Sequence, residues 1–149
     1  MAEKKLKFKI VTPEKLILEE EVAQVSLPTT EGEITVLPDH IPLIAGLSSG
    51  DVVAKSNGED VPIAVTGGFL EVKKNDKGET EVAVLADFAE HVYELSDEAI
   101  EKAKARAAML KKAMENKDIV DFEHFSAELE ASLNRVKIAD KWRTKKYRK

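Results

Sequence analysis

The sequence predicts an α+β protein in which an N-terminal antiparallel β-sandwich is followed by a C-terminal antiparallel two-helix hairpin. Up to about residue 90, short segments alternate apolar and polar residues with a period of two. Turn-forming residues separate these segments at intervals of roughly ten residues, which is typical of a sandwich or barrel rather than of a βαβ fold. From residue 95 onward, apolar residues recur every three or four positions instead. We therefore predict two domains, residues 1–90 and residues 91–149.

The first half divides into at least eight predicted strands. In residues 5–10, three apolar residues alternate with three lysines, so one face of this strand is expected to meet water. Further strands are expected at residues 16–18, 22–27, 32–37, 51–56, 61–65, 68–73 and 80–86. The Asn57-Gly58 pair predicts a type I′ hairpin turn, and residues 75–78 predict a second hairpin.

Two adjacent glycines, Gly67 and Gly68, interrupt one of these strand patterns. Glycine inside a strand indicates either a β-bulge or a place where another backbone comes close. The pair is equally compatible with a purely structural irregularity and with a partner contact, and the residues alone do not decide between them.

Residues 27–50 are the stretch around which the rest of the chain is expected to be organised, and they contain a rigid corner. Pro38 and Pro42 each fix φ, withhold a backbone donor and push the preceding residue towards an extended conformation. A strand, a stiff turn and a return into the core are therefore expected here. Asp39 and His40 are expected on the outside of this corner, between apolar anchors, which suits contact with a partner.

Two helices joined by a loop of about five residues are predicted after residue 95. Ser96 can cap the first helix and Asp121 the second. The expected seam of the first helix is Ile100, Ala103, Ala107, Leu110 and Met114, and that of the second is Phe122, Phe125, Leu129, Leu133 and Val136. Because alanines bury little area, the hairpin should be marginally stable alone and should lean on the sandwich or on a partner.

No catalytic, cofactor or metal site is predicted. The chain has no cysteine, which excludes disulfides and thiolate metal sites. No pair among His40, His91 and His124 has the i, i+4 spacing of a helical zinc site, and nucleotide-binding and hydrolase motifs are absent. Neither a membrane-spanning apolar run nor a signal segment is present, so an intracellular soluble protein is expected.

Charge is unevenly distributed along the chain. Residues 1–94 carry a net −9 and residues 95–149 a net +4, which together give the chain's −5. The most basic stretch is residues 141–149. It has three interpretations: a solvated helix end, a nucleic-acid-binding tail that stacks bases on Trp142 and Tyr147, or a surface for an acidic protein partner. The acidic remainder of the chain disfavours nucleic acid.

Three segments together resemble the epsilon subunit of F-type ATP synthases. Residues 31–43 (EGEITVLPDHIPL) contain that family's Gly-Glu, its apolar run and its Pro-x-His-x-Pro-Leu. The other two segments are residues 65–72 (VTGGFLEV) and 82–87 (VAVLAD). Their order and spacing and the chain length also fit, and the resemblance extends from about Leu6 to Glu90.

The resemblance implies a non-catalytic central-stalk subunit. In that family the β-sandwich lies on the gamma subunit and the c-ring, and the positions matching those contacts are Glu33 and His40, with Asp39 beside them. The helical hairpin either folds onto the sandwich or extends towards the alpha/beta catalytic head. Its basic residues, here Lys141, Arg143, Lys145 and Lys146, would then meet an acidic segment of beta and restrain ATP hydrolysis. The expected location is the cytoplasmic face of the bacterial cell membrane, with membrane contact only through the complex.

One departure from the family bears on nucleotide binding. Members that bind ATP carry Ile/Leu-Asp-x-x-Arg-Ala at the start of the first hairpin helix, whereas Ser96 and Ala99 replace the aspartate and the arginine here. No bound cofactor is therefore expected. The alternative from another class is a free-standing β-sandwich binding module with a basic helical tail, which needs no stable complex with a gamma-type coiled coil.

Overall fold

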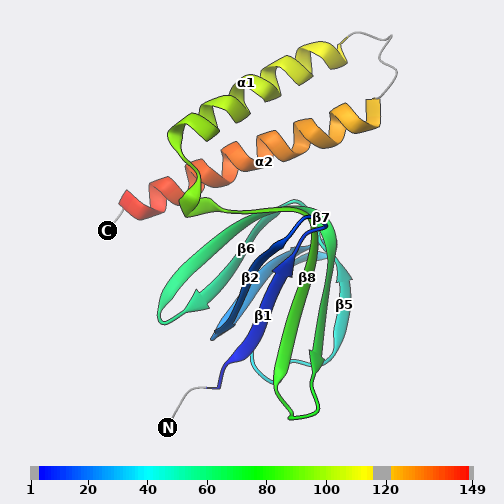
Figure 1. The fold of residues 1–149 in the computed structure, drawn as a ribbon, viewed down its shortest axis with the longest axis vertical. Helices are drawn as coiled ribbons and strands as arrows, with labels where there is room; N and C mark the ends of the chain where they lie inside the picture. The colour runs from blue at the N-terminus through cyan, green and yellow to red at the C-terminus, as the bar shows by residue number, and fades with distance from the viewer. Residues whose placement is uncertain (1–3, 116–121, 148–149) are drawn as a thin grey trace. The chain divides into compact units, whose positions relative to one another are not determined.

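The computed structural model describes residues 4–115 and 122–147 of the 149-residue chain (Figure 1). The chain divides into two compact units, Met1–His91 and Val92–Lys149. The described strands of the first unit are β1 (Leu6–Val11), β2 (Leu16–Val22), β3 (Gln24–Thr29), β4 (Gly32–Val36), β5 (Leu43–Gly46), β6 (Gly50–Ser56), β7 (Glu59–Lys74) and β8 (Thr80–His91). The second unit contains the 3-10 turn η1 (Val92–Glu94) and the helices α1 (Asp97–Met114) and α2 (Phe122–Tyr147).

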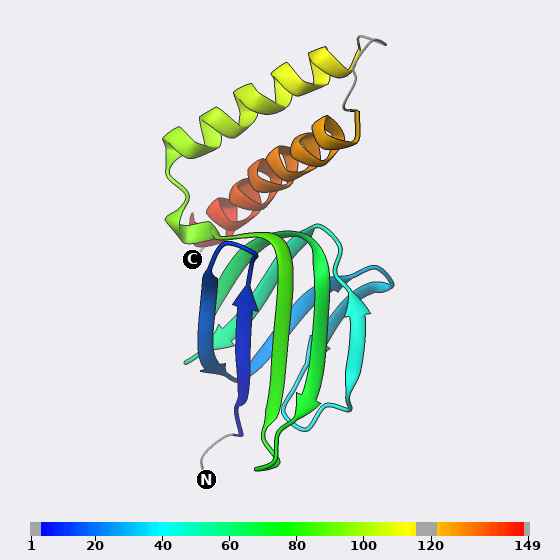
Figure 2. The same cartoon turned by 45° about the vertical axis from the view of Figure 1, so that its right-hand side comes forward.

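The strands of the first unit form one sheet that folds into two layers (Figure 2). The long strands β7 and β8 belong to both layers. Residues 68–74 of β7 pair with residues 80–86 of β8, and β5 and β1 flank this part of the pair. Residues 63–66 of β7 pair with residues 88–91 of β8, and β6, β3 and β4 continue from there. We call β2-β1-β8-β7-β5 the first layer and β8-β7-β6-β3-β4 the second layer. The predicted sandwich is thus confirmed.

One strand pair departs from the antiparallel pattern. β1 runs parallel to β8, with Phe8 opposite Val82 and Ile10 opposite Val84, while the other pairs among the described strands are antiparallel. A parallel pair needs a long connection, and here the strands β2 to β7 supply it. The first and last strands of the sandwich therefore meet inside one layer.

A single apolar core lies between the two layers. Strand β1 alternates as predicted, because Leu6, Phe8 and Ile10 are almost fully buried while the lysines between them are exposed. The remaining buried apolar residues of this core are Val22, Val25, Leu27, Val36, Leu47, Val52, Ala54, Ile63, Val65, Leu70, Val72, Val82, Val84, Ala86 and Ala89. Both layers contribute, so the first unit has a core of its own.

The predicted strand at residues 22–27 is wrong in one respect. The chain leaves β2 at Val22 and enters β3 at Gln24, so Ala23 lies between two strands rather than within one. β2 pairs with β1 in the first layer, whereas β3 pairs with β4 and β6 in the second. The alternation is reset at this crossing, which is why Val22 and Val25 both point inward despite their odd spacing.

Gly67 and Gly68 mark the place where β7 passes from one layer to the other. Thr66 lies opposite Phe88 and Gly68 opposite Ala86, so the pairing register continues and no residue is inserted. Both glycines have positive φ, 63° and 113°. A Cβ on Gly68 would lie 2.0 Å from the Leu85 carbonyl oxygen. The register shows no bulge, and the backbone that comes close is the chain's own β8. A partner contact at this pair stays a prediction.

The helical unit follows the predicted hairpin with one correction. Ser96 caps α1 by accepting a hydrogen bond from the Ala99 backbone N–H, and Ile100, Ala103, Ala107 and Leu110 are buried. On α2, Ser132 is buried, but Leu133 is 53% exposed. One residue along a helix turns the side chain by about 100°, so the predicted seam was placed one residue too far at this point. The predicted loop and the Asp121 cap lie outside the described residues.

A chain ending at Tyr93 is expected to fold as an independent sandwich. All the buried apolar residues of the first unit's core lie before this point. Urea unfolding followed by circular dichroism should therefore show one cooperative transition, with the full chain as the control. A broad, non-cooperative loss of signal in the shortened chain would show that the sandwich needs the helices.

Candidate functional site

The corner between β4 and β5 is a tight turn. Pro38 occupies the second position, Asp39 has φ of 70° in the third, and the His40 N–H donates to the Leu37 carbonyl at 3.1 Å. Proline second and positive φ third are the requirements of a type II turn. The six side chains of residues 37–42 are all exposed or half-buried. The corner is therefore a turn at the surface of the sandwich, and Asp39 is exposed as expected.

Asp39 is held by its own chain. Its carboxylate pairs with Lys4 Nζ at 2.5 Å and Lys74 Nζ at 3.3 Å, and its backbone N–H donates to Thr80 Oγ1 at 2.7 Å. The Lys4 hydrogen bond, followed by that of Lys74, holds the pKa of Asp39 below its usual value. The sequence predicted a displayed acidic group at this position. In the structure this acid forms ion pairs with two lysines of the same unit.

His40 is half-buried beside Asp39 and keeps one ring nitrogen for other contacts. Nδ1 lies 2.7 Å from the Ile41 carbonyl oxygen. Because a carbonyl only accepts, Nδ1 must carry a proton in this contact. A neutral His40 ring therefore presents Nε2 as a hydrogen-bond acceptor. That is an arrangement suited to meeting a donor on another protein.

Glu33 lies on β4, the edge strand of the second layer, opposite Pro28 of β3. It is exposed, and within the described part of the chain its carboxylate forms no hydrogen bond or ion pair. The structure thus leaves Glu33 free and places His40 on the corner that follows the same strand. It brings Asp39 together with Lys4, Lys74 and Thr80 instead of with Glu33.

An apolar surface that the sequence did not reveal covers part of the first layer. Phe69 of β7 lies opposite Leu85 of β8, Leu85 lies beside Val11 of β1, and Val11 pairs with Leu16 of β2. Phe69, Leu85 and Leu16 are 62%, 58% and 51% exposed. Ile44 of β5, one row away, is 74% exposed. We call Ile44, Phe69, Leu85, Val11 and Leu16 the apolar strip.

The strip faces outward because of strand alternation. Leu70 and Val84, the neighbours of Phe69 and Leu85 along their strands, point into the core and are buried. The sequence contains two pairs of adjacent apolar residues, at 69–70 and 84–85. Because successive residues of a strand point to opposite faces, one residue of each pair must face the solvent. Alternation alone does not tell which of the two is inside.

Charged residues border the strip on the same outer face. Lys73, Glu81, Lys7 and Glu21 lie opposite one another across β7, β8, β1 and β2, so their signs alternate from strand to strand. They line a depression together with Lys9, Glu19 and Ala83. The face therefore combines an apolar row with an ordered pattern of charge.

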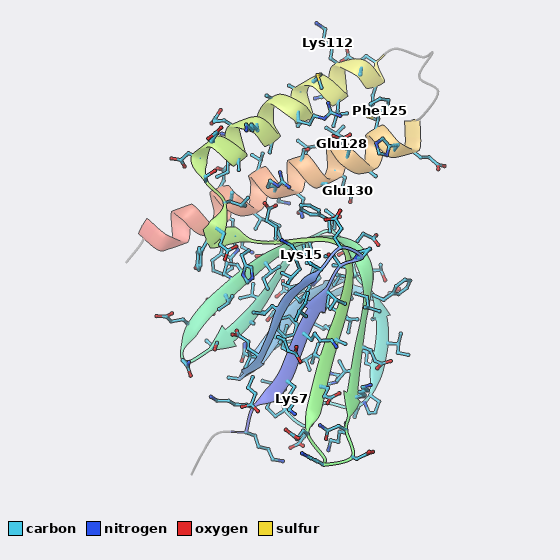
Figure 3. All side chains as sticks on the ribbon, viewed as in Figure 1. Lys7, Lys15, Lys112, Phe125, Glu128 and Glu130 are labelled. Carbon is cyan, nitrogen blue, oxygen red and sulfur yellow. The ribbon has the colours of Figure 1, made fainter. Side chains whose placement is uncertain are left out.

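Within the helical unit, an ion pair between Arg106 and Glu128 joins the two helices. Arg106 of α1 donates from Nε and Nη2 to the two carboxylate oxygens of Glu128, which is labelled in Figure 3, on α2, at 2.6 and 3.0 Å. This bond raises the pKa of Arg106 and lowers that of Glu128. The pKa of Glu128 is lower in the folded than in the unfolded protein. The ion pair therefore adds to the free energy of unfolding at pH values above the unfolded pKa of Glu128, and this stabilisation is lost as the pH falls through the folded pKa.

The predicted basic tail is only partly visible. Lys141 is exposed, and its Nζ lies 5.7 Å from the centre of the Trp142 ring, which meets Tyr93 edge-on at 6.3 Å. Arg143, Lys145 and Lys146 lie on the last turns of α2, but their side chains are outside the described part of the structure.

Chemistry-bearing groups do not converge elsewhere in the described residues. His91 contacts the Ile17 carbonyl oxygen through Nε2, and His124 pairs with Glu128 on the same helix. No cluster of three His, Asp or Glu side chains with metal-ligand geometry occurs among the residues described. Neither α1 nor the described part of α2 is long and apolar enough to cross a membrane.

An exposed apolar strip beside an exposed turn is a surface typical of proteins that bind other proteins. Comparison with known families identifies the family to which the chain belongs. The model of the β-sandwich domain of the ATP synthase delta/epsilon chain matches residues 5–92. Curated relatives agree over nearly the full chain: an ATP synthase epsilon chain of Nitratidesulfovibrio vulgaris is 39% identical and covers 91% of this chain and 96% of its own. The chain belongs to the ATP synthase epsilon chain family.

Other similarities agree with this assignment. An ATP synthase epsilon chain of Dehalococcoides mccartyi is 40% identical over 93% of this chain and 95% of its own. Among solved structures, a chain of the Euglena gracilis mitochondrial ATP synthase matches 87% of this chain and 78% of its own, with a TM-score of 0.67 and 23% identity. A chain of the Tetrahymena thermophila enzyme has a TM-score of 0.54 at 15% identity. These two structures share the fold.

Proposed function

We propose that this epsilon-family chain is a non-catalytic subunit of the central stalk, with its sandwich docked on the gamma subunit and the c-ring. The observation that carries this proposal is the apolar strip. Outer faces of antiparallel sheets are usually polar, and contiguous exposed apolar patches mark interaction sites. Ile44 and Phe69 are 74% and 62% exposed, so they have the most apolar surface of the strip to bury against a partner.

The two surfaces of the sandwich suit two partners. We assign the apolar strip to gamma, because a coiled coil offers a side-chain surface long enough to cross several strands. The alternating charges beside the strip would fix the orientation, since electrostatic complementarity gives register more than affinity. We assign the polar corner, with His40 and the free carboxylate of Glu33, to the c-ring. The two similar solved structures belong to ATP synthase assemblies that include the c-ring, one of them a central stalk with its c-ring, which supports the c-ring as a partner.

The proposal is tested by assembly. Purified chain, added to a gamma–c-ring subcomplex that lacks it, is expected to co-elute in a stable complex on size-exclusion chromatography. A free-standing binding module, the rival from another class, would elute alone. Failure of the wild-type chain to bind would therefore reject the stalk proposal.

We further propose that, in a chain docked on the central stalk, the helical unit restrains ATP hydrolysis. Its basic end would extend towards the alpha/beta head and meet an acidic segment of beta. The α1 seam supports a detachable element, because two of its four buried residues are alanines and each contributes little area. No cofactor is assigned, and the complex is placed on the cytoplasmic face of the bacterial membrane, which this chain reaches only through its partners.

The tail makes a specific prediction about hydrolysis. Exposed ion pairs contribute about 0–1 kcal/mol each, so each single change of Lys141, Arg143, Lys145 or Lys146 to alanine should have little effect. The four changes together are expected to remove a few kcal/mol of attraction and to release hydrolysis by roughly tenfold or more. In the wild type, restraint should weaken with rising salt, because screening acts over about 8 Å at physiological ionic strength.

The measurement is the hydrolysis rate of the reconstituted complex across a salt series. The matched control replaces Lys102, Lys104, Lys111 and Lys112 on α1 by alanine, which removes the same charge from the other helix. Equal rates for wild type and tail variant at every salt concentration would mean that the tail is only a solvated helix end.

A further inference from the structure

The corner is tied to the sandwich through Asp39. Its contacts reach three segments that are far away in sequence: Lys4 just before β1, Lys74 at the end of β7, and Thr80 at the start of β8. β1, β7 and β8 are neighbours in the first layer, so all three contacts converge on one end of that layer. We call this set of contacts the Asp39 clasp.

Other anchors for the tip of the corner are weak. The buried side chain before it is Val36 of β4, and Leu43 after it is only half-buried. Between them, Leu37 is 53% and Ile41 74% exposed. Apolar burial therefore does little to fix the direction in which His40 and Ile41 point. The clasp ties the tip to the first layer by one backbone-to-side-chain hydrogen bond and two ion pairs.

Aspartate is well suited to holding the turn and forming these contacts. Aspartate tolerates the positive φ of 70° that the turn requires at this position, better than most side chains. Its N–H bonds the Thr80 hydroxyl, whose residue is 3% exposed and thus fixed in the layer. Its carboxylate accepts hydrogen bonds from two lysines, one just before β1 and one at the end of β7.

We propose that Asp39 is a positioning residue that holds the corner in its binding-competent orientation without itself contacting the partner. This inference rests on the proposed function and adds a division of labour within the corner: Asp39 orients, and His40 and Ile41 make contact. If only a fraction of molecules holds the competent orientation, the apparent affinity falls by that fraction. Loss of the clasp is thus expected to weaken assembly roughly threefold to tenfold.

A mutant cycle separates positioning from direct contact. Asp39→Asn keeps the turn geometry and removes the charge, while Lys4→Gln with Lys74→Gln removes the cations and leaves Asp39 intact. Affinity for the gamma–c-ring subcomplex is measured for each and for all three changes together. Because clasp members act through one another, the combined variant should be no weaker than Asp39→Asn alone. Additive losses would mean that Asp39 contacts the partner directly, and an unchanged affinity would mean that the clasp does not position anything; either result overturns the proposal.

Two further measurements complete the test. Asp60→Asn, which removes the same charge from an exposed position in the β6–β7 hairpin, should bind like the wild type. In the isolated protein, Asp39→Asn should speed hydrogen exchange of the His40 amide and leave the amides of β7 unchanged. Unchanged exchange at His40 would contradict the clasp even if the wild-type chain failed to bind the subcomplex, so the two proposals fail separately.

Discussion

Replacing Gly68 with alanine is expected to destabilise the sandwich by about 3 kcal/mol or more, one of the largest effects of any single substitution in the chain. The added Cβ would lie 2.0 Å from the Leu85 carbonyl oxygen and 2.9 Å from Ala86 Cα. Both are backbone atoms of the neighbouring strand, so neither can move without breaking the β7–β8 ladder that both layers share. A φ of 113° adds strain for any side chain.

The control for this change is Gly78→Ala. Gly78 also has a positive φ, 77°, but a Cβ there meets nothing within 4 Å. Left-handed strain alone should cost about 1–2 kcal/mol. Urea unfolding followed by circular dichroism measures both variants. Similar losses at the two positions would show that close strand contact at Gly68 does not matter to the fold.

Replacing Phe69 and Leu85 together with threonine is expected to weaken assembly with gamma at least thirtyfold. Truncating a large side chain at the centre of an interface costs about 2 kcal/mol or more, which is roughly thirtyfold, and the costs of neighbouring side chains do not simply add. Stability should change little, because both side chains are more than half exposed and threonine suits a strand. The measurement is the affinity for the gamma–c-ring subcomplex, with the unfolding midpoint determined in parallel.

Met109→Gln provides the matched control. Met109 is 54% exposed on α1 and belongs to the helical unit rather than to the strip. Its replacement removes a comparable exposed apolar side chain and should leave assembly unchanged. If the strip variant bound as tightly as this control, the strip would not be the gamma surface, and the exposed apolar row would need another explanation.

Local chemistry made much of the fold predictable. The type I′ turn was expected from Asn57-Gly58, and these residues have φ of 52° and 80°. The Ser96 cap and the buried alanine positions of α1 also follow from residue type and spacing alone. In each case the determining groups lie within a few residues of one another, so the sequence contains the whole interaction.

Features that sequence reasoning placed wrongly or missed are set by contacts between distant parts of the chain. The crossing at Ala23 depends on which layer each strand joins, and the buried position of Ser132 depends on how α2 meets α1. The contacts of Asp39 with Lys4 and Thr80, which are 35 and 41 residues away, could not be predicted from local sequence either, while its role at a partner interface stays a prediction. The strip is likewise assembled from five strands, so its rows become visible only when the register is known.

The central claim, that the sandwich docks on gamma through the apolar strip, is tested most directly by photocrosslinking. A photoreactive phenylalanine analogue is placed at Phe69, and at the exposed Glu59 in the β6–β7 hairpin as the control, in chains assembled into the whole ATP synthase. Illumination is expected to link position 69 to the gamma subunit and to leave position 59 without that product. Crosslinks from position 69 to another subunit, or none at all in a correctly assembled complex, would contradict the account.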